Sequence, residues 1–219
     1  MKENNVIIYG VGRFAEYVRF ILEKDGDYKI VGQCVEQEYI TKNNVNEKEL
    51  ISFENLEKFY NPSKYKFFIA VGNNKIRKRI FDMVQEKGYS FISHVSDNTH
   101  VSEDIKLGKN ILIADNSIIQ PFVIVEDSTI IMGSKIGHHS KIGKHNLLSG
   151  AHLGGNVKIG DHSFLGLNVA IKENTTVAKN NIIGMGCNIS SDTKPGEVYS
   201  APKPIKRTIS YSKIIDHYL

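Results

Sequence analysis

The sequence predicts a small α/β domain followed by a parallel β-helix of six-residue repeats and a short C-terminal extension. Three observations predict this arrangement: strands alternate with helices early in the chain, an aliphatic residue then returns every six positions, and prolines interrupt that pattern near the end. We place the α/β domain at residues 1–92, the β-helix at 93–190 and the extension at 191–219. A chain of 219 residues has room for one large domain or two small ones.

The first domain shows the alternation of strands and helices that is typical of a parallel sheet. Three short apolar runs predict buried strands: 6–9, 29–35 and 67–71. Apolar residues at helical spacing predict helices over 15–26 and 75–87, and Gly26 and Gly88 end them. Residues 36–65 are polar, and we expect only loop and a short helix there. Such alternation forms a parallel sheet with right-handed crossovers.

The second domain carries two series of aliphatic residues with a period of six. The first series is Leu112, Ile118, Ile124, Ile130, Ile136, Ile142 and Leu148, and the second is Ile159, Leu165, Ile171, Val177, Ile183 and Ile189. This period is not the 3.6 of a helix or the 2 of a plain strand, and it is typical of a parallel β-helix. Leu148 to Ile159 spans eleven positions, so one residue is missing between the series. Val95 and Val101 are expected in an irregular opening coil.

The missing residue changes which side chains stack. Three hexapeptides make one triangular coil of about 18 residues, and equivalent residues of successive coils lie about 4.8 Å apart. Across the missing residue the offset becomes about 17, which places His145 under His162. If that residue is lost between Leu148 and Leu153, His138 lies under Gly155. Because Gly155 has no side chain, we expect space for a ligand beside His138.

Histidines gather in the repeat. Five of the eight lie within 25 residues: His138, His139, His145, His152 and His162. This density exceeds what exposed polar positions alone predict, and a neutral imidazole at pH 7 can act as a general base. A zinc site shared between subunits is the alternative, but it needs three converging imidazoles and only one pair stacks clearly. We therefore expect catalysis without a metal.

A segment after the first predicted strand resembles a nucleotide-binding turn. It consists of Gly10, Val11, Gly12, Arg13 and Phe14, and Ala15 follows. Glycines at such positions let a phosphate approach the backbone at a helix N-terminus. A plain strand-to-helix turn is the alternative reading of the same residues.

Two further candidate binding sites lie where predicted strands end. Val35 and Glu36 end the second strand, near where an acidic residue contacts a ribose in nucleotide-binding domains. Gly72, Asn73 and Asn74 end the third strand at the carboxyl edge of the sheet, where ligands of α/β domains collect. Asn74 is also expected to cap the following helix, and capping is compatible with substrate contact.

Charge and composition limit the partners and the compartment. The net charge of +4 favours anionic small molecules, and no basic-aromatic pattern indicates nucleic acid. No apolar run approaches the roughly 20 residues of a membrane span, and the N-terminus carries no signal-peptide pattern. Cys34 and Cys187 lack a CxxC spacing and are expected to be free thiols. We therefore expect a cytoplasmic protein.

Several of these segments together resemble a known family. They are Ile136 to Gly143 (Ile-Gly-His-His-Ser-Lys-Ile-Gly), Gly154 to Gly160, and Phe67 to Lys78. They are similar to the sugar acetyltransferases of the sialic-acid O-acetyltransferase and bacillosamine-pathway N-acetyltransferase group. The similarity covers residues 5 to about 200. Many acyltransferases share the repeat alone, and the α/β domain in front of it makes the resemblance more specific.

The resemblance implies a fold, an assembly and a reaction. It implies a homotrimer of left-handed β-helices, an exception to the right-handed crossover rule. The family's Rossmann-like α/β domain binds a nucleotide-linked amino sugar, and acetyl-CoA lies in the groove between neighbouring coils. We therefore expect an acetyl-CoA-dependent N-acetyltransferase of bacterial glycan or O-antigen precursor synthesis. The alternatives are O-acetylation of sialic acid or a related sugar, a metal-dependent β-helix enzyme and a non-catalytic binding protein.

The resemblance also assigns roles to individual residues. The catalytic general base falls on His138, and His139 follows it directly. Coenzyme contacts fall on or near His145, Asn146, Gly155, Leu167 and Met185. Contacts to the sugar nucleotide fall on Gly10, Val11, Gly12, Arg13, Phe14, Val35, Glu36, Gly72, Asn73 and Asn74.

Two positions depart from the family pattern. The family has Asp or Glu directly after the catalytic histidine, which raises its basicity, whereas this chain has His139. Either a carboxylate from elsewhere substitutes, or the base is weaker. The first turn has Gly12-Arg13-Phe14 in place of the family's Ser-Gly-His, so Arg13 meets a phosphate or the nucleotide binds differently.

Overall fold

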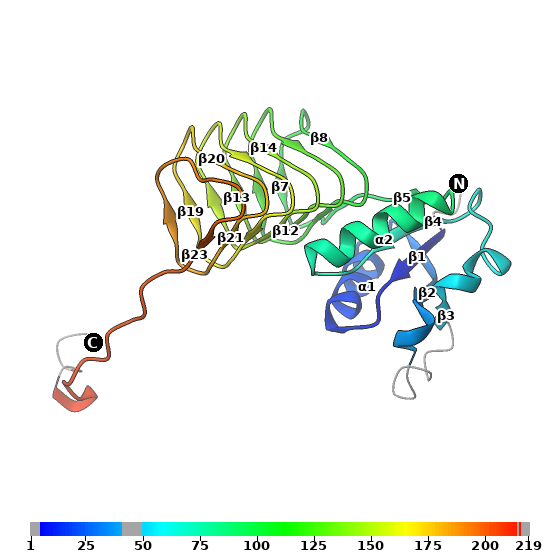
Figure 1. Cartoon of the computed structure of the whole chain (residues 1–219), viewed down its shortest axis with the longest axis horizontal. Helices are drawn as coiled ribbons and strands as arrows, with labels where there is room; N and C mark the ends of the chain where they lie inside the picture. The colour runs from blue at the N-terminus through cyan, green and yellow to red at the C-terminus, as the bar shows by residue number, and fades with distance from the viewer. Residues whose placement is uncertain (1–4, 41–49, 214, 216–219) are drawn as a thin grey trace.

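The computed structural model describes residues 5–40, 50–213 and 215, which form an α/β domain and a three-sided β-helix (Figure 1). A parallel sheet in the order β3-β2-β1-β4-β5 lies at the centre of the α/β domain. Its strands are β1 (Asn5–Tyr9), β2 (Lys29–Val35), β3 (Leu50–Ser52), β4 (Lys66–Ile69) and β5 (Ser90–Phe91). Its helices are α1 (Arg13–Asp25), α2 (Asn74–Glu86) and the short 3-10 helices η1 (Gln37–Tyr39) and η2 (Phe53–Lys58).

The predicted elements of this domain are confirmed to within two residues. Gly26 and Gly88 follow the two helices with φ of 77° and 81°, values that suit glycine at a helix end. Strand β3 was not predicted, because three residues are too few to show an alternation. Asn73 caps α2, with its Oδ1 accepting from Ile76 N at 3.0 Å, so the cap lies one residue before the expected Asn74.

Three parallel sheets form the faces of the β-helix, and we name them in chain order. Face 1 contains β6 (His94–Val95), β9 (Leu112–Ile113), β12 (Ile130–Met132), β15 (Leu147–Ser149), β18 (Phe164–Leu165), β21 (Ile182–Ile183) and β23 (Val198–Tyr199). Face 2 contains β7 (His100–Val101), β10 (Ile118–Ile119), β13 (Lys135–Ile136), β16 (His152–Leu153), β19 (Ala170–Ile171) and β22 (Asn188–Ile189). Face 3 contains β8 (Lys106–Leu107), β11 (Ile124–Val125), β14 (Lys141–Ile142), β17 (Lys158–Ile159) and β20 (Thr176–Val177).

The structure corrects the phase of the first aliphatic series. The inward residues of the early coils are Ile113, Ile119, Val125 and Ile131, one position after the predicted Leu112, Ile118, Ile124 and Ile130. Two intervals of five occur instead of one, from Ile131 to Ile136 and from Leu148 to Leu153. The sequence could not distinguish the two phases because both residues of each early strand are aliphatic. A one-residue shift moves a strand's side chains to the opposite face.

Face 1 carries apolar residues on its outer side because the α/β domain covers it. Leu112, Ile130 and Leu147 form one buried cluster with residues of β1, α1 and β4, such as Val18 and Phe68. This cluster holds the α/β domain against the early and middle coils. Figure 1 shows the domain beside this end of the β-helix. It also explains why outward-facing residues such as Leu112 and Ile130 are aliphatic and fit the pattern expected of the β-helix core.

The chain leaves the β-helix after β23 and runs away from the α/β domain (Figure 1). A last short 3-10 helix, η3 (Tyr211–Lys213), lies in this extension. The sequence also predicts a short helix over 212–218, of which the structure describes only residues 212, 213 and 215. Among the described helices, none combines the length and apolar character that crossing a bilayer requires.

Candidate functional site

The corners between faces explain part of the histidine cluster. His139, His145 and His162 have φ of 59°, 57° and 59°, in the left-handed region. Asparagine holds the equivalent corner in many coils, for example Asn156 and Asn174. Asn, Asp and His tolerate this conformation better than most residues do. Backbone geometry therefore accounts for three of the five histidines, and their density alone is weaker evidence for catalysis than the sequence suggested.

His138 has no such backbone explanation. It lies in the corner between faces 2 and 3, is exposed, and its backbone N donates to Gln120 Oε1 at 2.9 Å. A Cβ on Gly155 would lie 2.7 Å from His138 Cε1 and 2.8 Å from Nε2, so the ring occupies the space that the glycine leaves. The expected position of His138 beside Gly155 is confirmed. A cavity of about 480 Å³ opens here, lined by both residues and by parts of β10, β13 and β16.

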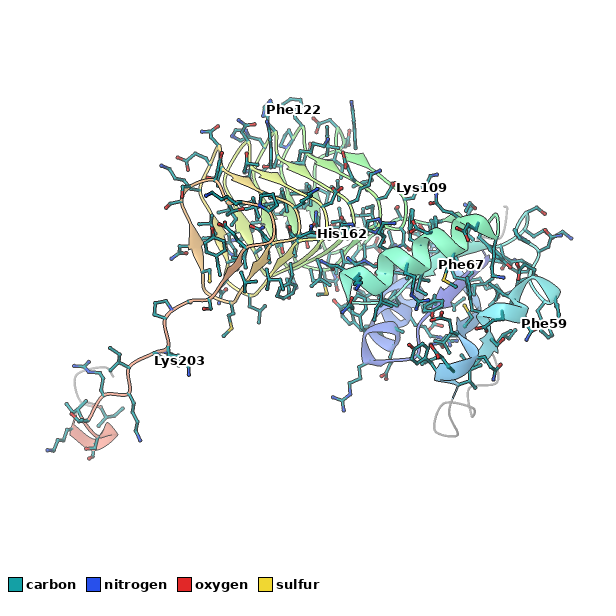
Figure 2. The ribbon with its side chains drawn as sticks, in the orientation of Figure 1. Phe59, Phe67, Lys109, Phe122, His162 and Lys203 are labelled. Atoms are coloured by element: carbon teal, nitrogen blue, oxygen red, sulfur yellow. The ribbon has the colours of Figure 1, made fainter. Side chains whose placement is uncertain are left out.

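His139 contacts His138 directly. The two Nδ1 atoms lie 3.0 Å apart, within hydrogen-bond distance. The His139 ring also packs on Phe122, with centroids 4.6 Å apart. Figure 2 shows Phe122 at the edge of the β-helix that faces away from the α/β domain. The pair therefore lies at the corner opposite face 1, against which the α/β domain packs.

His145 and His162 stack as the repeat arithmetic predicted. Their ring centroids are 5.0 Å apart with an interplanar angle of 9°, and Phe81 of α2 meets His145 edge-on. Burial and, to a smaller extent, the neighbouring His162 together lower the pKa of His145 to about 4. Burial also lowers the pKa of His162. Both imidazoles are therefore neutral at pH 7, and Nδ1 of His145 has no hydrogen-bond partner among the described residues.

A second cavity, of about 570 Å³, lies between the start of α2 and face 1. Its lining includes the predicted Gly72, Asn73 and Asn74. His162 also lines it, and Figure 2 shows this residue beside the N-terminal end of α2. Asn74 Nδ2 donates to Ser163 O at 2.8 Å and joins the loop to the β-helix. The other lining residues were not predicted from the sequence: Lys75, Lys78, Phe164, Asn180 and Ile182. No motif indicates them, since they converge only when α2 meets the coils.

Arg77 binds the loop whose residues Gly72 and Asn74 line this second cavity. Its side chain is fully buried, and desolvation lowers its pKa to about 9. The guanidinium donates to the carbonyl oxygens of Val71 and Gly72, each at 2.9 Å, and to Asn74 Oδ1 at 2.9 Å. It also donates to the carbonyl oxygens of Ser128 at 3.0 Å and Asn146 at 2.8 Å. One cation thus joins the strand-end loop to two coils.

The predicted nucleotide turn has a backbone that requires glycine. Gly10 has φ of 128°, and a Cβ there would lie 2.8 Å from Ala70 O. Gly12 caps α1, and its open surroundings contain no atom within 4 Å of an added Cβ. Arg13 is exposed, while Phe14 packs on Tyr17. The turn therefore presents backbone and a cation to solvent.

Glu36, the predicted ribose contact, is already paired. It lies directly after the buried Val35, and Arg79 binds it through both carboxylate oxygens, at 2.5 and 2.7 Å. Tyr9 O–H donates to it at 3.0 Å. The hydrogen bond from Arg79 lowers the pKa of Glu36, and this effect exceeds the opposite effect of burial. A ribose hydroxyl would share or displace these partners.

The five predicted coenzyme contacts lie on three different edges of the β-helix. His145 and Asn146 lie between faces 3 and 1, and both are buried, with Asn146 Oδ1 accepting from Ser163 N at 2.6 Å. Gly155 lies between faces 2 and 3. Leu167 and Met185 lie between faces 1 and 2, are exposed and stack in successive coils. One chain therefore does not bring the five residues together.

Metal ligands do not gather in the part of the chain that the structure describes. No group of three His, Cys, Asp or Glu side chains there is arranged to hold a metal ion. The two stacked histidines lack a third ligand of this kind.

Comparisons with known proteins match both parts of the chain. Residues 5–84 match the PglD N-terminal domain, and residues 91–197 match the GMPPB C-terminal domain. No curated protein matches the chain. The resemblance expected from the sequence is thereby confirmed for the α/β domain.

Solved structures match nearly the whole chain. The acetyltransferase domain of PglB from Neisseria gonorrhoeae FA1090 is 24% identical, with a TM-score of 0.82, covering 93% of this chain and all of that one. PerB from Caulobacter crescentus, solved with CoA and GDP-perosamine, is 21% identical, with a TM-score of 0.80 and coverage of 89% and 92%. WeeI from Acinetobacter baumannii AYE is 18% identical, with a TM-score of 0.73 and coverage of 88% and 94%. These matches confirm the expected fold, an α/β domain followed by a left-handed parallel β-helix.

Proposed function

We propose that this chain is an acetyl-CoA-dependent N-acetyltransferase that acts on the amine of a nucleotide-linked amino sugar, with His138 as general base. The observation that carries the proposal is the imidazole of His138, seated over Gly155 at an exposed cavity, with no hydrogen bond to Nε2 among the described residues. The similar structures support the substrate class, since PerB was solved with CoA and GDP-perosamine and the PglB domain with acetyl coenzyme A. No metal is needed for this reaction.

The residues support a simple order of bond changes. The amine attacks the thioester carbonyl, a C–N bond forms, and Nε2 of His138 accepts the proton that the amine loses. The C–S bond then breaks, and the coenzyme thiolate takes that proton. General base assistance of this kind contributes about 10²–10⁴-fold. The backbone N–H of Gly155 is the candidate to stabilise the oxyanion, whereas that of Gly143 already donates to Ile159 O at 2.8 Å.

The site is proposed to form between copies of the chain in a homotrimer. In one copy, the cavity beside His138 and the cavity beside α2 share no lining residue and lie at different corners. The predicted coenzyme contacts are likewise spread over three edges. Three copies around a threefold axis can bring His138 of one copy to the α2 cavity of its neighbour, and such closed symmetry is common.

The α/β domain is proposed to hold the sugar nucleotide across the carboxyl edge of its sheet. The turn at Gly10–Phe14, the strand end at Val35 and Glu36, and Gly72–Asn74 all lie at that edge. Lys75 and Lys78 add positive charge beside the last of these, which suits an anionic group. We assign these residues to the substrate and Leu167 and Met185 to the coenzyme.

The reaction is proposed to take place in the cytoplasm. Both cysteines, Cys34 and Cys187, are free and buried, which suits a reducing compartment.

Replacing His138 by Ala tests the assignment. We expect kcat to fall about 10²–10⁴-fold, measured as thiol release from acetyl-CoA with GDP-, UDP- and dTDP-linked amino sugars. The matched control is His100→Ala, which removes an exposed histidine of face 2 that does not line the cavity and should leave turnover unchanged. Full turnover of His138→Ala would refute the role of His138. Absence of thiol release by the wild type with every acceptor would refute the reaction.

A further inference from the structure

We infer that His139 is a positioning residue that accepts a hydrogen bond from Nδ1 of His138 and so keeps the Nε2 lone pair of His138 available. This inference rests on the proposed function, because it explains how the same site keeps its base in the reactive form. It also answers what stands in place of a carboxylate after His138.

The argument begins with the proton between the two rings. The Nδ1 atoms are 3.0 Å apart, so one nitrogen donates an N–H and the other accepts it. If His139 donated, the neutral His138 would carry its own proton on Nε2. That nitrogen then could not accept a proton from a substrate. Catalysis by His138 therefore requires the opposite arrangement, with His138 donating through Nδ1 and His139 accepting.

The surroundings hold both rings in this arrangement. The His138 edge that carries Nε2 lies over Gly155 and faces away from His139. The His139 ring packs on Phe122, and its backbone N donates to Pro121 O at 3.1 Å. Phe122 is held in turn, since its N donates to Asp104 Oδ2 at 2.9 Å. The acceptor is therefore fixed from three successive coils.

A neutral imidazole does this differently from a carboxylate. It accepts the Nδ1 proton without placing a negative charge beside His138. When His138 takes the substrate proton, the hydrogen bond between the rings can carry the positive charge toward His139 as the shared proton moves. The pair then holds one added proton, which leaves with the coenzyme thiolate, so protons balance over the cycle.

The left-handed conformation of residue 139 allows substitutions that keep or remove the hydrogen-bond acceptor. With φ of 59°, Asn is tolerated there as well as His, and its Oδ1 can still accept the Nδ1 proton. Ala removes the acceptor and adds corner strain. Asn116→Ala controls for that strain, because Asn116 has φ of 62° at an exposed corner between faces 1 and 2 and does not line this cavity.

The first measurement is the tautomer of His138, read from ¹⁵N chemical shifts of histidine-labelled protein without substrate. We expect the lone pair on Nε2 in the wild type and in His139→Asn. We expect the proton to move to Nε2 in a detectable population of His139→Ala, with no change in Asn116→Ala. A wild-type His138 with its proton on Nε2, or a tautomer unaffected by His139→Ala, would overturn the inference.

The second measurement is turnover. His139→Ala should lower kcat about 10–100-fold, because the His138 ring loses the residue that orients it, and should leave the KM for acetyl-CoA unchanged. His139→Asn should recover most of that loss, whereas His139→Gly, which suits the left-handed corner but has no acceptor, should not. Equal losses in the Ala and Asn variants would contradict the positioning role. Because the tautomer is measured without substrate, its result does not depend on the proposed reaction. Failure of the proposed function and failure of this inference can therefore be told apart.

Discussion

At the scale of single residues, the corners of the coils decide which histidines carry chemistry. Left-handed corners accept His as readily as Asn, so His139, His145 and His162 need no function to be present. His138 lies outside that conformation, and its ring uses space that only a glycine leaves free. The candidate base is therefore identified by its neighbour and not by the number of histidines.

Gly155→Ala tests that space directly. The added Cβ would lie 2.7 Å from the His138 ring, closer than side chains tolerate, so the imidazole must turn aside. We expect kcat to fall about 10-fold or more, because a displaced base loses its alignment. The change in unfolding free energy should be small, since the ring is exposed and can move. Circular dichroism checks the fold, and unchanged turnover would show that the seat over Gly155 is not used.

The buried His145 predicts a pH dependence of stability. Its pKa is about 4 in the folded chain and 6.5 in the unfolded one, so the unfolded state binds more protons between these values. The contribution of the neutral, buried His145 to the free energy of unfolding is complete above pH 6.5 and is lost as the pH falls toward 4. The maximum effect is about 3 kcal/mol. His145→Asn keeps the left-handed corner and should flatten this part of the curve, measured by urea unfolding from pH 7 to 4.

At the scale of elements, α2 and the loop before it depend on one buried cation. Arg77 is the donor for the carbonyl oxygens of Val71, Gly72, Ser128 and Asn146, which belong to three separate segments. Its side chain pairs with no carboxylate among the described contacts, so five neutral acceptors stabilise a desolvated charge. The position of the candidate substrate loop therefore depends on how the two domains pack.

Arg77→Lys should disturb both stability and substrate binding. An ammonium group has three donors and cannot reach acceptors in so many directions, so buried carbonyls lose their partners. We expect a loss of about 2–4 kcal/mol in unfolding free energy. We also expect a raised KM for the sugar nucleotide and an unchanged KM for acetyl-CoA. The surface variant Arg19→Lys is the control, and equal stability of the two variants would contradict the role of Arg77.

At the scale of the whole molecule, the candidate groups lie at separate corners, which supports the proposal that neighbouring copies complete each other's sites. His138 and the α2 cavity lie at separate corners of one β-helix, and face 1 is covered by the chain's own α/β domain. Under the proposed function, a monomer alone would hold two incomplete sites.

Mixing inactive variants tests this arrangement. His138→Ala and Asn74→Ala should each abolish most activity, while co-expressed mixed assemblies regain about one quarter of wild-type turnover, since random trimers pair intact halves that often. Thiol release measures the recovery, and size-exclusion chromatography with light scattering measures the assembly. A site within one chain would show no recovery on mixing.

The sequence by itself determined the features that depend on local periodicity and chain arithmetic. The approximate bounds of the predicted strands and helices, the six-residue coils, the stacking of His145 on His162 and the position of His138 over Gly155 all followed, because each is set by spacing along the chain. Tertiary structure alone decided the phase of the early coils, since both residues of those strands are aliphatic and only the packing of face 1 separates them. It also decided the Arg79 pairing of Glu36 and the burial of Arg77, because these contacts join segments far apart in sequence, and no local pattern records a distance across the fold.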